Sequence, residues 1–145
     1  MQYANDISSP ISPSAANNLY VANVHYNYAG TVTVYASHGG SPLRTISQGV
    51  KVPYSLAFDS SQNLYVANYA VNTVTVYAPG GSSVLRTISQ GMKGPTAIAF
   101  NPRSGNLFVS DQQNNTVTVY RKGSKKLLQT IDMFHAGNLK SRLIW

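Results

Sequence analysis

Apolar and polar residues alternate along much of this chain with a period of two, as in a β-strand whose two sides meet different surroundings. Over 19–23, Leu and Val alternate with Tyr and Ala, and over 31–35, Val alternates with Thr and Tyr. Most of these residues are β-branched or aromatic, which favours strands, and neither segment has the spacing of an amphipathic helix. We therefore predict an all-β protein built from short strands.

The strand pattern occurs three times along the chain. Asn-Leu-Tyr-Val-Ala-Asn begins at Asn18 and at Asn63, and Asn-Leu-Phe-Val-Ser-Asp begins at Asn106. Thr-Val-Thr-Val-Tyr follows at 31–35, 73–77 and 116–120. The copies start 45 and then 43 residues apart, which indicates a repeat protein in which each copy is one supersecondary unit.

Turn-forming residues divide each copy into strands. Gly-Gly and Pro-Gly-Gly segments follow the Thr-Val-Thr-Val-Tyr motif in the first two copies, and glycine reaches the positive φ angles that tight hairpins need. A complete copy then holds four strands. In the middle copy these are predicted at Pro53–Phe58, Leu64–Ala67, Thr73–Tyr77 and Val84–Ile88.

Four antiparallel strands in a repeat of this length are typical of a β-propeller blade. The motif order resembles the NHL and YVTN class of propeller repeats: Asn-Leu-Tyr-Val-Ala-Asn, a short loop, Thr-Val-Thr-Val-Tyr, then Pro-x-x-[Leu/Ile]-Ala-Phe. The resemblance covers about 19–131. It implies a propeller, usually of six or seven blades, and permits an extracellular or cell-surface origin. It implies no single function, because the class includes binding modules, extracellular scaffolds and a few lyases and lactonases.

The repeat divides the chain into an irregular segment over 1–17 and a three-blade unit over 18–145, with blades at 18–47, 53–88 and 95–131. The first blade shows only three strands, because the stretch before Asn18 contains Pro10 and Pro13. Residues 140–145 offer the missing strand, since Leu143-Ile144-Trp145 aligns with Leu56-Ala57-Phe58. We therefore expect 140–145 to close the first blade.

Closed propellers usually have four or more blades, so three blades are expected to assemble, and a homodimer of about six blades fits best. The alternative is that the chain is a fragment of a larger structural surface propeller. Periodicity does not separate these two interpretations.

The composition says more about the kind of binding partner than about the fold. Only 10% of residues are charged, there is no cysteine, and 11 Lys and Arg against 4 acids give a formal net charge of +7. This balance suits an anionic partner. Four of the eleven basic residues, Arg121, Lys122, Lys125 and Lys126, form one hairpin, where they either bind an anion or protect a sheet edge from pairing. Nucleic acid is not favoured, because only Tyr120 lies beside this hairpin.

Neither a membrane span nor a signal peptide is predicted from this sequence. No apolar run approaches about 18 residues, and the first ten residues lack a basic start followed by an apolar stretch. The compartment is left open.

The candidate ligand site lies in the loops between the second and third strands. The first of these loops is longer, because Asn23 to Thr31 spans eight positions whereas Asn68 to Thr73 spans five. The extra residues include His and Tyr, which stack on sugars and other flat ligands. The predicted ligand-binding residues are His25, Tyr26, Tyr28, Tyr69 and Asn72. The competing interpretation is that the insertion only lengthens an exposed loop.

Catalytic and metal-binding patterns are weak. His25, His38 and His135 have no metal-ligand spacing, and there is no Gly-x-Ser-x-Gly motif. The repeated Asn23, Asn68 and Asp111 are predicted to be structural turn caps rather than cation ligands. We therefore predict no cofactor, no metal and no catalytic residue. The favoured function is a non-enzymatic propeller that binds a glycan or protein, and the alternative is a lyase or lactonase.

Overall fold

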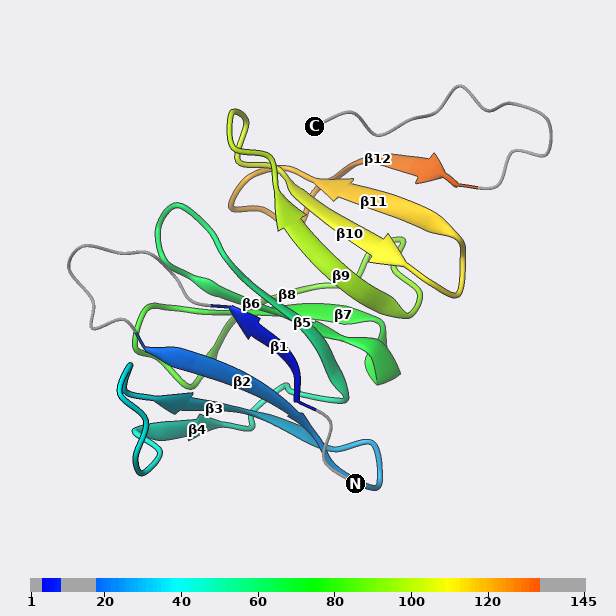
Figure 1. The fold of residues 1–145 in the computed structure, drawn as a ribbon. Coiled ribbons are helices and arrows are strands. Elements are labelled where there is room, and N and C mark those ends of the chain that lie inside the picture. Colours follow the sequence, from blue (N-terminus) through cyan, green and yellow to red (C-terminus); the bar gives the residue numbers. More distant parts are fainter. Residues whose placement is uncertain (1–3, 9–17, 134–145) are drawn as a thin grey trace.

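The computed structural model of this chain describes residues 4–8 and 18–133. It contains twelve strands in these ranges and one 3-10 helix, η1 (Tyr69–Val71). The strands form three four-stranded antiparallel sheets, which are the three blades (Figure 1). The first blade holds β1 (Ala4–Ser8), β2 (Leu19–Val24), β3 (Gly30–Tyr35) and β4 (Arg44–Ile46). The second holds β5 (Pro53–Phe58), β6 (Leu64–Asn68), β7 (Thr73–Tyr77) and β8 (Val84–Ile88). The third holds β9 (Pro95–Phe100), β10 (Leu107–Asp111), β11 (Thr116–Tyr120) and β12 (Leu127–Asp132).

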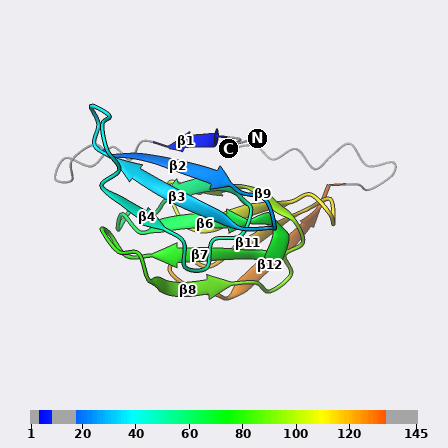
Figure 2. The same cartoon turned by 90° about the horizontal axis from the view of Figure 1, so that it is seen from below.

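Within each blade the strands follow one another in sequence order, each paired with the next (Figure 2 shows β6, β7 and β8 one below another). The registers are equivalent in the three blades. Leu19 pairs with Tyr35, Leu64 with Tyr77, and Leu107 with Tyr120. The prediction of an all-β fold with three blades of four strands is confirmed.

The first blade differs from the sequence prediction at its innermost strand. Residues 4–8 form β1, which pairs with β2 through Ile7 and Ser8, so the expectation of an irregular segment is corrected for these residues. Backbone pairing explains the difference, because the edge of β2 supplies partners for a segment that has no alternating pattern of its own. The proposed closing strand at 140–145 lies outside the described residues, and in the first blade β1 holds the innermost position.

Two apolar cores lie between the blades, one on each side of the second blade. Tyr20, Ala22, Val32, Val34 and Ile46 of the first blade pack against Leu56, Leu64, Val66 and Tyr77 of the second. The equivalent residues of the second blade, Tyr65, Ala67, Val74, Val76 and Ile88, pack against Ile98, Leu107, Val109 and Tyr120 of the third. Successive side chains of a strand point to opposite faces of its sheet. The second blade is covered on both faces, so successive side chains of its strands are buried alternately in the two cores.

The last tyrosine of the Thr-Val-Thr-Val-Tyr motif connects neighbouring blades. The Tyr77 hydroxyl donates to the Gln48 carbonyl at 2.6 Å, and the Tyr120 hydroxyl donates to the Gln90 carbonyl at 2.5 Å. Both acceptors lie in the linker that leaves the preceding blade. Burial raises the pKa of Tyr120 to about 12, so its hydroxyl stays protonated and remains a donor at ordinary pH.

The repeated asparagine holds the incoming linker to its blade. The Asn68 side chain donates to the Val66 carbonyl and to Thr75 Oγ1, and its oxygen accepts from the Lys51 backbone N–H at 2.9 Å. Asp111 accepts in the same way from the Lys93 backbone N–H at 3.2 Å. These side chains are structural, as predicted, but they join a linker to a strand rather than capping their own turn.

Candidate functional site

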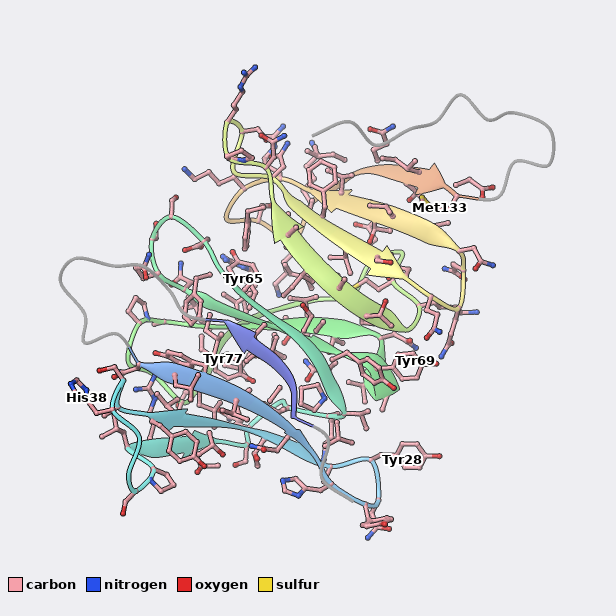
Figure 3. The ribbon with its side chains drawn as sticks, in the orientation of Figure 1. Tyr28, His38, Tyr65, Tyr69, Tyr77 and Met133 are labelled. Carbon is pink, nitrogen blue, oxygen red and sulfur yellow. The ribbon has the colours of Figure 1, made fainter. Side chains whose placement is uncertain are left out.

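Three loops and two linkers gather at one end of the blades, which we call the loop face. It comprises the loops 25–29, 69–72 and 112–115 and the linkers 47–52 and 89–94. The loops of the second and third blades are held beside the linkers that enter those blades, since the Tyr69 N–H donates to the Val52 carbonyl and the Gln112 N–H to the Gly94 carbonyl. Figure 3 shows Tyr28, Tyr69 and Met133 along this side of the molecule.

The first-blade loop presents two tyrosines to solvent. Tyr26 is 79% exposed and Tyr28 is 77% exposed. Asn27 and Tyr28 have φ angles of 67° and 59°, in the left-handed region that few aromatic residues adopt. The third predicted residue, His25, is held at the base of the loop, where its Nε2 lies 3.2 Å from Thr31 Oγ1. The two tyrosine rings are therefore exposed to solvent, whereas the His25 ring contacts Thr31 of β3.

Tyr69 and Asn72 have different surroundings. The Tyr69 ring packs on the Tyr54 ring of β5 with centroids 4.9 Å apart. The Asn72 side-chain oxygen accepts from the Gly94 N–H at 2.8 Å, and its backbone is left-handed with a φ of 56°. Asn72 therefore secures the next linker, while Tyr69 supports the exposed ring of Tyr54.

Beside Tyr54, the loop face is hollowed by a cavity of about 480 Å³. Its lining combines an aromatic ring, hydroxyl groups, amides and one carboxyl group, with Met133 at its border. The lining residues are Tyr54, Thr96, Ser110, Asp111, Gln112, Asn115, Thr116 and Met133. Sequence analysis missed this hollow, because Tyr54, Thr96 and Ser110 lie within strands. One sequence signal was present: the residue after the repeated proline differs between the second and third copies, with Tyr54 after Pro53 and Thr96 after Pro95.

The carboxyl group of the hollow belongs to Asp111, which is only 1% exposed. Its two oxygens accept from the Lys93 N–H and from Thr118 Oγ1, the latter at 2.7 Å. Burial raises the pKa of Asp111 above its ordinary value of 3.8, because desolvation penalises the charged form more than these hydrogen bonds favour it.

Having Asp111 in place of asparagine also changes the hydrogen bonding of Thr116, its partner in β11. Asn23 and Asn68 each place a side-chain N–H 3.4 Å from the hydroxyl of Thr31 or Thr73. An ionised aspartate has no donor, and the equivalent Thr116 Oγ1 is buried with no hydrogen-bond partner among the described residues. The third blade therefore differs from the other two in both charge and hydrogen bonding at this position.

The Asp111→Asn variant is expected to raise the free energy of unfolding at pH 7 by about 1 kcal/mol, because it removes a buried charge and restores the donor found at Asn68. The folded-state pKa of Asp111 is raised, so the penalty is present above that pKa and is relieved as the pH falls through it toward 3.8. Urea denaturation of both proteins between pH 3 and pH 8 should show the difference shrinking in acid.

Asn68→Asp serves as the reciprocal control, since it places a carboxyl group at the equivalent buried position and should destabilise the chain at pH 7. A stability difference for Asp111→Asn that is negative or independent of pH would contradict the role assigned to burial.

The basic hairpin lies at the other end of the blades, in the turn between β11 and β12. The side chains of Arg121, Lys122, Lys125 and Lys126 are all exposed. A second hollow of about 240 Å³ is lined there by Lys122 and Arg103, together with Asp59. The predicted anion site and the predicted aromatic loop are thus on opposite ends of the molecule, and Asp59 offsets part of the positive charge near Lys122.

Within residues 4–8 and 18–133, the search for metal ligands finds no group of three or more His, Cys, Asp or Glu side chains able to hold an ion. The described part of the chain also contains no helix long and apolar enough to cross a membrane.

Comparison with known proteins places the fold. No protein-family model and no curated protein matches the sequence. Among solved structures, a protein of unknown function from Bacteroides caccae is 17% identical, with a TM-score of 0.62 over 88% of this chain and 46% of that one. A chain in a nidogen/laminin complex is 20% identical, with a TM-score of 0.63 over 79% of this chain and 43% of that one.

A third similar structure is the Dos1 propeller, 14% identical, with a TM-score of 0.72 over 90% of this chain and 35% of that one. At these identities the likeness establishes the fold alone, and the fold is that of β-propeller blades. The chain spans less than half the length of each of these three structures.

Proposed function

We propose that this chain is a non-enzymatic β-propeller module of the NHL and YVTN type that binds a glycan on its loop face. The observation that carries the proposal is the hollow of about 480 Å³, in which an exposed aromatic ring stands beside hydroxyl, amide and carboxyl groups. Sugars present apolar C–H faces together with many hydroxyl groups, so they require both kinds of contact at once.

Tyr54 is the stacking surface in this proposal. It is 37% exposed, and the Tyr69 ring behind it limits its movement. The polar groups around it are both donors and acceptors, since Gln112 and Asn115 carry amides and Thr96 carries a hydroxyl.

The first-blade loop extends the proposed site along the same face. Tyr26 and Tyr28 expose aromatic rings that can bury apolar area against a ligand at low entropic cost. The left-handed φ of Tyr28 stores backbone strain, a feature that clusters at functional sites. A ligand longer than one sugar would contact both the hollow and this loop.

A protein ligand is the second candidate, because one of the similar folds occurs in a nidogen/laminin complex. Exposed tyrosines are also frequent anchors in protein interfaces. An enzymatic alternative of the lyase or lactonase type has less support, since the described residues bring no histidine into the hollow.

A glycan array probed with the labelled chain tests the proposal. Binding to a defined set of glycans is expected. Binding on a protein array with no glycan signal would replace the glycan with a protein ligand. Turnover of a lactone or glycan substrate by purified protein would overturn the non-enzymatic assignment.

For a glycan found in this way, Tyr54→Ala and Tyr28→Ala are each expected to weaken the affinity at least several-fold, because each removes a stacking ring that is worth more than about 1 kcal/mol. Calorimetric titration measures the effect. Leu43→Ala is the matched control, since Leu43 is exposed at the opposite end of the blades. Equal affinities for wild type and both tyrosine variants would show that the ligand lies elsewhere.

A further inference from the structure

No described element covers the face of the third blade that is buried in the other two blades, and we call it the third-blade face. Its members are Ala97, Ala99, Phe108, Ser110, Val117 and Ile131. Ala97 and Ala99 are exposed, and Phe108 and Ile131 are partly exposed. An apolar hollow of about 230 Å³ lies on this face, between β9, β10 and Met133.

On the first blade the opposite face is the one that no strand within residues 4–8 and 18–133 covers, and we call it the first-blade face. Its members are Leu19, Val21 and Tyr35, all partly exposed. The equivalent residues of the second and third blades, Leu64, Val66 and Tyr77 and then Leu107, Val109 and Tyr120, are no more than 3% exposed. The same repeat positions are thus buried wherever a preceding blade covers them.

The equivalents of these two faces pack against each other twice within the chain, once between the first and second blades and once between the second and third. The face of the first blade that carries Tyr20, Val32 and Ile46 covers the second blade at Leu64 and Val66. The face of the second blade that carries Tyr65, Val74 and Ile88 covers the third blade at Leu107 and Val109. The third-blade face has Phe108, Val117 and Ile131 at the covering positions, so its size and apolar character fit the first-blade face.

We propose that the third-blade face binds the first-blade face of a second copy of this chain. The contact is heterologous, because the two surfaces differ, and two such contacts close a ring of two copies. Two copies supply six blades, within the range of four to eight in which propellers close, whereas three copies supply nine. This proposal does not depend on the ligand proposed above.

The Tyr35 hydroxyl is a polar group that the proposed interface would pair. Its counterparts Tyr77 and Tyr120 donate their hydroxyl groups to the linker that leaves the preceding blade. In the described part of the chain no blade lies against Tyr35, and its hydroxyl has no hydrogen-bond partner there. In the assembly it would meet the backbone of Met133 of the second copy, which stands two residues after Ile131 as Gln48 and Gln90 stand after Ile46 and Ile88.

Light scattering after size exclusion tests the assembly. Wild type is expected at twice the 15.7 kDa chain mass, and Ala99→Arg at the mass of one chain, with the dissociation constant raised at least tenfold. Ser82→Arg is the control, because Ser82 is exposed in the β7–β8 turn, away from both faces. A wild-type monomer at all concentrations, or an Ala99→Arg dimer as stable as that of the control, would overturn the proposal.

Cross-linking tests which surfaces meet, independently of any loss of folding in the charged variant. The chain has no cysteine, so Ala99→Cys and Val21→Cys each introduce one reactive thiol. Their counterparts Ala57 and Val109 belong to one core between the second and third blades. A short bis-maleimide should join an equimolar mixture of the two variants and leave each variant alone unjoined. Equal cross-linking of either variant alone would show a contact between like surfaces and refute the heterologous ring.

Discussion

Replacing Asn68 with alanine is expected to lower the free energy of unfolding by about 3 kcal/mol, because the side chain is fully buried and satisfies groups on three segments. Its removal leaves the Lys51 N–H without its acceptor and takes one of two partners from Thr75 Oγ1, which keeps the Tyr77 hydroxyl at 3.0 Å. Each buried polar group left unpaired costs about 1–3 kcal/mol. Urea denaturation followed by circular dichroism measures the change.

Asn114→Ala is the matched control for Asn68→Ala. Asn114 is exposed in the loop between β10 and β11, and its loss should change the stability by less than about 0.5 kcal/mol. Similar small effects for both variants would show that the repeated asparagine does not hold the linker to the blade.

Replacing Tyr77 with alanine is expected to cost about 4 kcal/mol, comparable to the removal of other large buried aromatic side chains. The ring is completely buried in the core between the first and second blades. Tyr77→Phe keeps the ring and removes only the hydroxyl donor to the Gln48 carbonyl, so a loss of about 1–2 kcal/mol is expected. Thermal and urea denaturation of both variants separate packing from hydrogen bonding.

Tyr28→Phe is the control for the hydroxyl, since Tyr28 is exposed and its loss should be neutral. A Tyr77→Phe variant as stable as wild type would indicate that the hydrogen bond between blade and linker adds nothing to stability. A loss as large as that of Tyr77→Ala would contradict the weight given to packing.

The strands were predictable where local chemistry and the repeat agree. In the middle copy the predicted strands match the observed ones except that β6 ends at Asn68 rather than Ala67. Alternating β-branched and aromatic residues define such strands without help from the rest of the fold. By contrast, the segment Ala4–Ser8, with the sequence Ala-Asn-Asp-Ile-Ser, has no alternating pattern, and β1 depends on the edge that β2 offers.

The candidate site was predictable only in part. The inserted loop was visible as a departure from the repeat, so Tyr26 and Tyr28 were identified from the sequence, and both are exposed. The hollow was not visible, because Tyr54, Thr96 and Asp111 come from three different strands and meet only through the packing of the second blade on the third. The Asn72 side chain accepts from the Gly94 N–H, a contact over 22 residues of sequence that local patterns do not reveal.

The salt dependence of glycan affinity tests the central claim, that ligand binding belongs to the loop face and not to the basic hairpin. Calorimetric titration at low and high ionic strength is the measurement, applied to wild type, Tyr54→Ala and a variant with Lys122, Lys125 and Lys126 changed to alanine. Stacking and neutral hydrogen bonds are little screened by salt. The account predicts an affinity that is nearly independent of salt, lost in Tyr54→Ala and retained in the lysine variant. An affinity that falls steeply with salt and disappears in the lysine variant would contradict it.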